Sequence, residues 1–122
     1  MLHDIIINNV HFSPDVDHSL FIMVTDENRE DRMINLQPCE VLALGSFIQY
    51  RTTEYITLNG ITFAPDCDDS LFIMVTDENR EDRCIDLRPD EVNVVAGYLH
   101  SPAGRALVRN AMMTKPAARL AA

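Results

Sequence analysis

The sequence predicts an α+β protein of two tandem repeats of about 50 residues, each an antiparallel β-meander followed by an α-helix, with a C-terminal helix at the end. Fourteen residues, SLFIMVTDENREDR, occur twice without a change, at Ser19–Arg32 and at Ser70–Arg83. The offset of 51 extends further, because residues 5–49 align without a gap to residues 56–100 with 25 identities in 45 positions. The expected parts are two repeats packed with pseudo-twofold symmetry and a basic helical tail, over residues 1–51, 52–102 and 103–122.

Each repeat is expected to begin with a β-hairpin. In the second repeat, Asn59-Gly60 stands between the β-rich residues 55–58 and 61–63. This dipeptide favours a tight turn because both central positions require positive φ. Asn8-Asn9 takes the same place in the first repeat and fits such a turn less well.

The next strand is apolar at five successive positions, Leu20–Val24, and again at Leu71–Val75. An apolar run without alternation is typical of a strand whose two faces are both covered. A helix can cover one face, so we expect the second cover to come from the sister repeat or from another chain. A unit of about 50 residues also buries too little surface to be stable alone. We therefore expect the repeats to pack on each other, and the chain to form a homodimer or a larger oligomer.

A fourth strand and a helix complete each repeat. Ile34 and Leu36 alternate with polar residues, as in a half-exposed strand. Pro38 then suits the first position of a helix, and Glu40 favours the positive end of the helix dipole. The second repeat carries the equivalent residues Ile85, Leu87, Pro89 and Glu91. A last helix is expected over residues 101–113, where a Ser-Pro pair provides the start.

The charge is unevenly distributed along the chain. The net charge is −9, made up of −13 in residues 1–100 and +4 in residues 101–122. An acidic body repels the phosphates of nucleic acids and attracts basic surfaces. The expected partner is therefore a protein with a basic surface, and nucleic acid is not expected. No apolar run reaches the roughly 18 residues of a membrane span, so we expect a cytoplasmic protein without membrane association.

Motifs for catalysis are absent from the sequence. It contains no GxSxG, GxxxxGK[ST], GxGxxG or HExxH, and we expect no enzyme, no catalytic residue and no cofactor. The connections Asp15-Val16-Asp17-His18 and Asp66-Cys67-Asp68-Asp69 hold carboxylates at alternating positions, but the glycine and the distal glutamate of a calcium loop are missing. Turns in which aspartate bonds to the backbone explain these connections better, and we expect no metal site.

The polar turn inside the repeated block is the candidate binding site. Tips of hairpins usually tolerate change, yet this turn is identical in both repeats. One interpretation is a pair of mixed-charge tips that dock together on a partner with the affinity gain of tethered modules. The other is a solvated turn with local ion pairs, made identical by recombination, and the sequence leaves both open. The residues are Asp26, Glu27, Arg29, Glu30, Asp31 and Arg32, with Asp77, Glu78, Arg80, Glu81, Asp82 and Arg83.

These observations favour a small acidic, non-enzymatic protein-binding or inhibitor module that engages a basic, nucleic-acid-binding surface of its target. Size and charge of this kind are common among phage-type counter-defence proteins, which is an analogy and assigns no residue. The alternative is an oligomeric small-ligand protein that holds a nucleotide or another anion. The residues for that alternative are Arg29, Arg32, Arg80 and Arg83.

The order of elements expected over residues 5–100 resembles the ββββα units of the PC4-like and Whirly single-strand nucleic-acid-binding proteins. The resemblance is one of pattern and rests on no specific motif, so no single residue receives a role from it. It implies a β-surface for single strands, which makes a PC4-like single-strand nucleic-acid binder the third function considered.

Overall fold

The computed structural model describes residues 4–25, 31–50, 53–58, 60–76 and 82–113. The first repeat contains β1 (Ile5–Ile7), β2 (Val10–Pro14), β3 (Leu20–Thr25), β4 (Asp31–Leu36) and α1 (Pro38–Gln49). The second contains β5 (Ile56–Leu58), β6 (Ile61–Pro65), β7 (Leu71–Thr76), β8 (Asp82–Leu87) and α2 (Pro89–His100), and α3 (Pro102–Met113) follows. The predicted α+β class, with four strands and then a helix in each half, is thus confirmed.

Each half forms its own antiparallel sheet with the strands in chain order, β1-β2-β3-β4 and β5-β6-β7-β8. The pairing of Phe12 with Ile22 recurs 51 residues later, as do the other pairs of the two sheets. At the first hairpin Asn8 has a φ of 56°, and at the second Gly60 has a φ of 82°, while Asn59 lies outside the described residues. Asn and Gly tolerate this left-handed backbone, which explains why the chain reverses at these positions.

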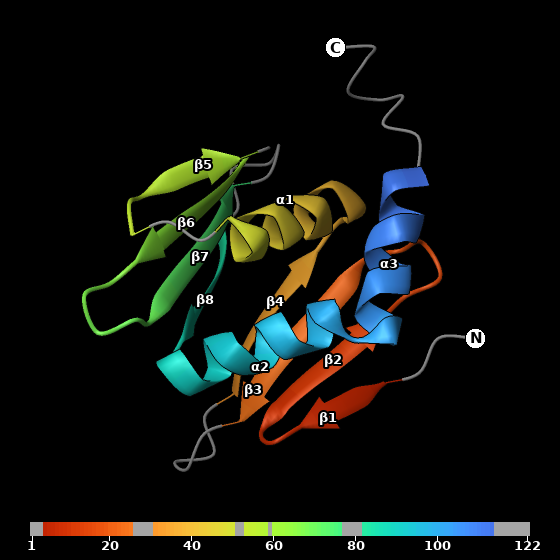
Figure 1. Cartoon of the computed structure of the whole chain (residues 1–122), viewed down its shortest axis with the longest axis horizontal. Coiled ribbons are helices and arrows are strands. Elements are labelled where there is room, and N and C mark those ends of the chain that lie inside the picture. Colours follow the sequence, from red (N-terminus) through yellow and green to blue (C-terminus); the bar gives the residue numbers. More distant parts are fainter. Residues whose placement is uncertain (1–3, 26–30, 51–52, 59, 77–81, 114–122) are drawn as a thin grey trace.

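Each of the first two helices packs on the sheet of the other half as well as on its own. α1 contacts β4 and β6, and α2 contacts β8 and β2. Phe47 of α1 stacks on Phe63 of β6 with ring centroids 4.5 Å apart, and Tyr98 of α2 stacks on Phe12 of β2 at 4.1 Å. Both helices lie on the same side of the two sheets, with α3 packed across them (Figure 1). One hydrophobic core therefore serves both halves.

Within the described residues, the sister half does not cover the second face of the long strands. On β3, Leu20, Ile22 and Val24 are buried, whereas Phe21 and Met23 are half-buried. The two sheets lie side by side and meet where β4 lies beside β8 (Figure 1). The expectation that the sister repeat could supply the second cover is therefore wrong, because the sheets associate at their edges and not face to face.

The last helix has the predicted bounds. The hydroxyl of Ser101 accepts a hydrogen bond from the backbone N–H of Gly104 (3.2 Å), which caps the first turn. Leu107 of α3 is buried, while Arg105 and Arg109 are exposed. No helix in the described ranges is long and apolar enough to cross a membrane.

Candidate functional site

Most residues of the two predicted tips lie outside the described residues. They are Asp26, Glu27, Arg29 and Glu30 in the first tip and Asp77, Glu78, Arg80 and Glu81 in the second. Asp31 and Asp82 are the first residues of β4 and β8, and the structure describes their backbone alone. Arg32 and Arg83 are placed with their side chains, and both reach the junction between the two halves.

Arg32 forms a bidentate ion pair with Glu91 across this junction. Its Nη1 donates to Oε1 at 3.0 Å, and its Nη2 donates to Oε2 at 2.9 Å. Nη1 also donates to the backbone carbonyl oxygen of Asp86 on β8. The Glu91 side chain is 1% exposed and the Arg32 side chain is 23% exposed. The pair is therefore largely shielded from water. In such a buried place, either charge would be costly without the other.

A reciprocal pair joins Arg83 to Glu40. Nη1 and Nη2 of Arg83 donate to Oε1 and Oε2 of Glu40 at 3.2 and 3.1 Å, and Nη1 also donates to the carbonyl oxygen of Asn35 on β4. Each half thus supplies one arginine and one glutamate. Because β4 and β8 are the edge strands at which the two sheets meet, these contacts also give hydrogen-bond partners to carbonyl groups at that junction.

The two glutamates also satisfy the backbone at the start of their helices. Oε1 of Glu91 accepts a hydrogen bond from the N–H of Arg88, and Oε1 of Glu40 accepts one from the N–H of Gln37, both at 2.8 Å. Burial acts to raise the pKa of Glu91, but the hydrogen bonds from Arg32 and Arg88, together with their charges, outweigh it and hold the pKa below its usual value. Glu91 therefore remains charged at neutral pH.

These ion pairs were not predicted from the sequence. Glu40 and Glu91 were interpreted through the helix dipole, and Arg32 and Arg83 through the tips. The signal that could have revealed them is that an arginine and a glutamate recur at matching positions of the two repeats. When two such repeats pack side by side, the arginine of each can pair with the glutamate of the other. The finding also bears on the anion-binding alternative, since two of its four arginines already bind carboxylates.

The acidic connections between strands adopt the predicted side-chain turns. Oδ1 of Asp17 accepts hydrogen bonds from the hydroxyl and the backbone N–H of Ser19 at 2.6 and 3.0 Å, and Asp68 makes the same two bonds with Ser70. The hydroxyl bonds are the first cause of the lowered pKa of Asp17 and of Asp68. In the described part of the chain, no three His, Cys, Asp or Glu side chains are grouped so as to hold a metal ion.

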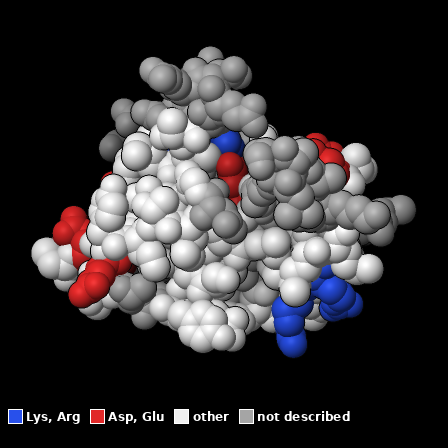
Figure 2. All heavy atoms as spheres, turned by 90° about the horizontal axis from the view of Figure 1, so that it is seen from above, with Lys and Arg blue, Asp and Glu red and all other residues white. Residues whose placement is uncertain are grey.

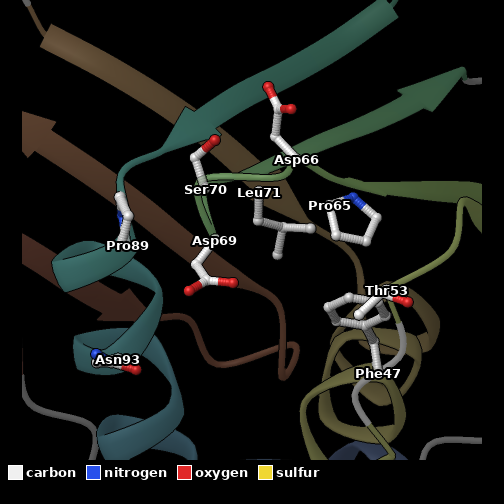
Figure 3. Close-up of a pocket in the computed structure, with 9 residues that line it drawn as sticks. All are labelled: Phe47, Thr53, Pro65, Asp66, Asp69, Ser70, Leu71, Pro89 and Asn93. Atoms are coloured by element: carbon white, nitrogen blue, oxygen red, sulfur yellow. The ribbon is translucent and has the colours of Figure 1, made fainter.

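A pocket of about 330 Å³ lies between the end of α1, the start of α2 and the connection from β6 to β7. The lining residues are Phe47, Thr53, Pro65, Asp66, Asp69, Ser70, Leu71, Pro89 and Asn93. Figure 3 shows the Asp69 carboxylate in the space between α2, which carries Asn93, and α1, which carries Phe47. The lining comes from both repeats, so no local sequence pattern marks it. The small-ligand alternative places its ligand in a pocket between repeats or subunits, but it assigns four arginines to that pocket, and none of them is among the described residues that line this one.

On the face shown in Figure 2, acidic side chains lie at the left and the upper right, basic side chains lie at the lower right, and one basic and one acidic side chain lie next to each other near the upper centre. A comparison of the chain with known protein families and with curated proteins gives no match.

Proposed function

We propose that this chain is a small acidic, non-enzymatic binding protein that inhibits a target by occupying the target's basic, nucleic-acid-binding surface. The observation that supports this function best is an excess of carboxylates. It remains after the two Arg–Glu ion pairs between the halves are set aside. Arg32 and Arg83 pair with Glu91 and Glu40, which leaves 17 acidic and four basic side chains in residues 1–100. A surface with this balance attracts a basic partner, and the attraction weakens as salt is added.

The two tips are the proposed contact sites, and we propose that the repeats are related by a pseudo-twofold axis. Reciprocal Arg–Glu pairs and matching strand registers support that symmetry. Equivalent tips could then bind two equivalent positions on a target, with the affinity gain of a tethered pair. The division into 1–51, 52–102 and 103–122 belongs to the same proposal.

A homodimer in the cytoplasm is also part of the proposal. Met33 is 46% exposed and Phe72 is 37% exposed on the sheet faces that the helices leave open, and apolar sheet faces are commonly covered. All three cysteines are unpaired, which fits a reducing compartment. Light scattering should give about twice the 13.8 kDa mass of one chain. A single-chain mass at micromolar concentration would remove the dimer from the proposal.

The function is tested by affinity capture with the full chain, at low salt and at about 0.5 M salt. A basic protein should be retained at low salt and released at high salt. Replacement of Asp26, Glu27, Glu30 and Asp31 by Lys should weaken capture, and so should the same change at Asp77, Glu78, Glu81 and Asp82. Both changes together should remove the affinity gain of the tethered pair. If every variant captures the target like the parent and melts unchanged, the tips are not the contact sites.

A control outside the tips is Asp86→Asn. It removes one exposed carboxylate from β8 and reproduces Asn35, the residue at the equivalent position of β4. Capture should be nearly unchanged, because one exposed charge away from the contact contributes little.

The two alternatives predict other results. A protein that holds a nucleotide through arginines should melt several degrees higher with one nucleotide. We expect no such rise, because Arg32 and Arg83 already bind carboxylates. A single-strand nucleic-acid binder should give a salt-sensitive gel shift. We expect no shift from a body that carries a net charge of −13 over residues 1–100.

A further inference from the structure

The pocket between α1, α2 and the β6–β7 connection combines apolar walls with hydrogen-bond acceptors. Its apolar residues are Phe47, Pro65, Leu71 and Pro89. Its polar residues are Thr53, Asp66, Asp69, Ser70 and Asn93. No lysine or arginine is among the described residues that line it. This composition disfavours an anion and favours a ligand that carries positive charge next to apolar surface.

Three of the polar side chains have no partner within the described residues. The hydroxyl of Thr53, the carboxylate of Asp69 and the amide of Asn93 make no hydrogen bond or ion pair there. The carboxylate of Asp66 and the hydroxyl of Ser70 instead bond within their own turn. Donors on a ligand can therefore reach Thr53, Asp69 and Asn93 without breaking a bond of the fold.

The equivalent positions of the first repeat show that the turn itself does not require these acceptors. His18 stands at the position of Asp69, and the two residues have nearly the same backbone, with φ values of 69° and 71°. His18 is half-buried, and its Nδ1 is enclosed without a hydrogen-bond partner in the described structure, whereas Asp69 is exposed. Leu42 stands at the position of Asn93. The acceptors of this pocket are thus a property of the second repeat and not of the shared fold.

We propose that this pocket binds a guanidinium group. Guanidinium presents five N–H donors in one plane, and a carboxylate accepts two of them side by side. The Asp69 carboxylate would accept hydrogen bonds from two of these N–H groups. The side-chain oxygens of Asn93 and Thr53 would accept hydrogen bonds from the remaining N–H groups. The methylene stem that carries the group and its flat faces pack mainly against Pro65 and Pro89, because Phe47 and Leu71 are 3% and 2% exposed. An ammonium group has three donors around a compact charge and no flat face, and it matches this lining less well.

The guanidinium has two possible sources with the same chemistry. One is an arginine side chain of the basic protein partner, and this source rests on the proposed function. The other is a free small molecule with a guanidinium group. The probes are N-acetyl-arginine amide and N-acetyl-lysine amide, which differ in the cationic group and carry no carboxylate that Asp69 would repel.

The test is an NMR titration of the isotope-labelled full chain with each probe. The arginine probe should shift the backbone amides of Asp69 and Asn93, with a dissociation constant on the order of 1 mM. The lysine probe should bind more weakly. Asp69→Asn and Asp69→His should each weaken binding of the arginine probe about ten-fold. The histidine variant should fold, because His18 adopts the same backbone in the first repeat. Asp86→Asn, the charge-matched control, should change the affinity by less than about two-fold.

Each outcome either identifies the source of the guanidinium group or contradicts its binding in this pocket. If excess arginine probe also releases the captured partner and Asp69→Asn weakens capture, the source is the partner's arginine. If the probe binds through Asp69 but does not affect capture, or if no partner is captured, the ligand is a free guanidinium compound. The affinity capture alone then tests the proposed function. The proposal is overturned if about 20 mM probe produces no shift that depends on Asp69. Equal or tighter binding of the lysine probe, or an equal loss in the Asp86→Asn variant, would also overturn it.

Discussion

Replacement of Glu91 by Gln should destabilise both halves of the protein at once. The carboxylate accepts two bonds from Arg32, at 3.0 and 2.9 Å, and one from the N–H of Arg88 at 2.8 Å. An amide of the same shape keeps one acceptor and loses the charge, so one bond from Arg32 disappears and the other weakens. Bonds to charged groups contribute about 1.5–3 kcal/mol each.

The size of the loss also depends on the arginine that remains. Breaking a buried ion pair typically costs about 3–5 kcal/mol. Arg32 keeps contact with water, since its side chain is 23% exposed, and this places the expected loss at the lower end of that range. We therefore expect Glu91→Gln to lower the free energy of unfolding by about 3 kcal/mol. The reciprocal Glu40→Gln should cost less, because the Glu40 bonds are longer, at 3.2 and 3.1 Å, and its side chain is 8% exposed.

Equilibrium unfolding in urea measures these values, and a double-mutant cycle with Arg32→Gln isolates the pair. The coupling energy should be about 1–3 kcal/mol. Hydrogen exchange in the Glu91→Gln variant should accelerate in β3 and in β7 alike, because the pair and the core join both halves. A loss below about 1 kcal/mol, a coupling near zero, or faster exchange in one half alone would refute this reasoning.

Three further predictions concern acid stability and packing. The pKa of Glu91 in the folded state lies below its usual value of 4.5, so the ionised carboxylate contributes fully to stability above about pH 4.5. This contribution is lost as the pH falls through the folded-state pKa. An acid-unfolding profile that Glu91→Gln leaves unchanged would contradict this. Tyr98→Phe should raise the unfolding free energy by about 1 kcal/mol, since the buried hydroxyl has no hydrogen-bond partner in the described structure; a marked loss in the same urea assay would indicate a partner. Gly104→Ala should cost about 3 kcal/mol, because the added Cβ would overlap the carbonyl oxygen of Tyr98. Gly97→Ala, which meets nothing within 4 Å, should gain up to about 1 kcal/mol in thermal or chemical unfolding, and equal effects of the two glycine variants would be inconsistent with this packing.

Local patterns were sufficient to predict the elements of this fold. The hairpin turn at residues 59–60, the proline and glutamate at the start of each helix, and the serine before Pro102 each act within a few residues of sequence. The structure has strands on both sides of the turn and helices that begin at Pro38, Pro89 and Pro102. Secondary-structure elements that depend on residues close together in the sequence can be predicted without knowledge of the rest of the fold.

The way in which the halves associate could not be predicted in this manner. Arg32 and Glu91 are 59 positions apart, and no local rule brings them together. The continuous apolar run of β3 was taken as evidence for cover on both faces, yet Phe21 and Met23 stay half-buried on the open side of the sheet. The pocket beside Asp69 depends on the same association, because Phe47 and Asp69 belong to different repeats.

The central claim, that the chain binds a basic partner through its acidic surface, is tested most directly by the affinity for the purified captured protein as a function of salt. Between about 0.05 and 0.5 M salt, the dissociation constant should rise by at least about ten-fold, because screening removes attraction between exposed charges. Reversal of charge in both tips should remove most of this dependence. A dissociation constant that is the same at both salt concentrations, or that the doubly reversed chain retains, would contradict the claim.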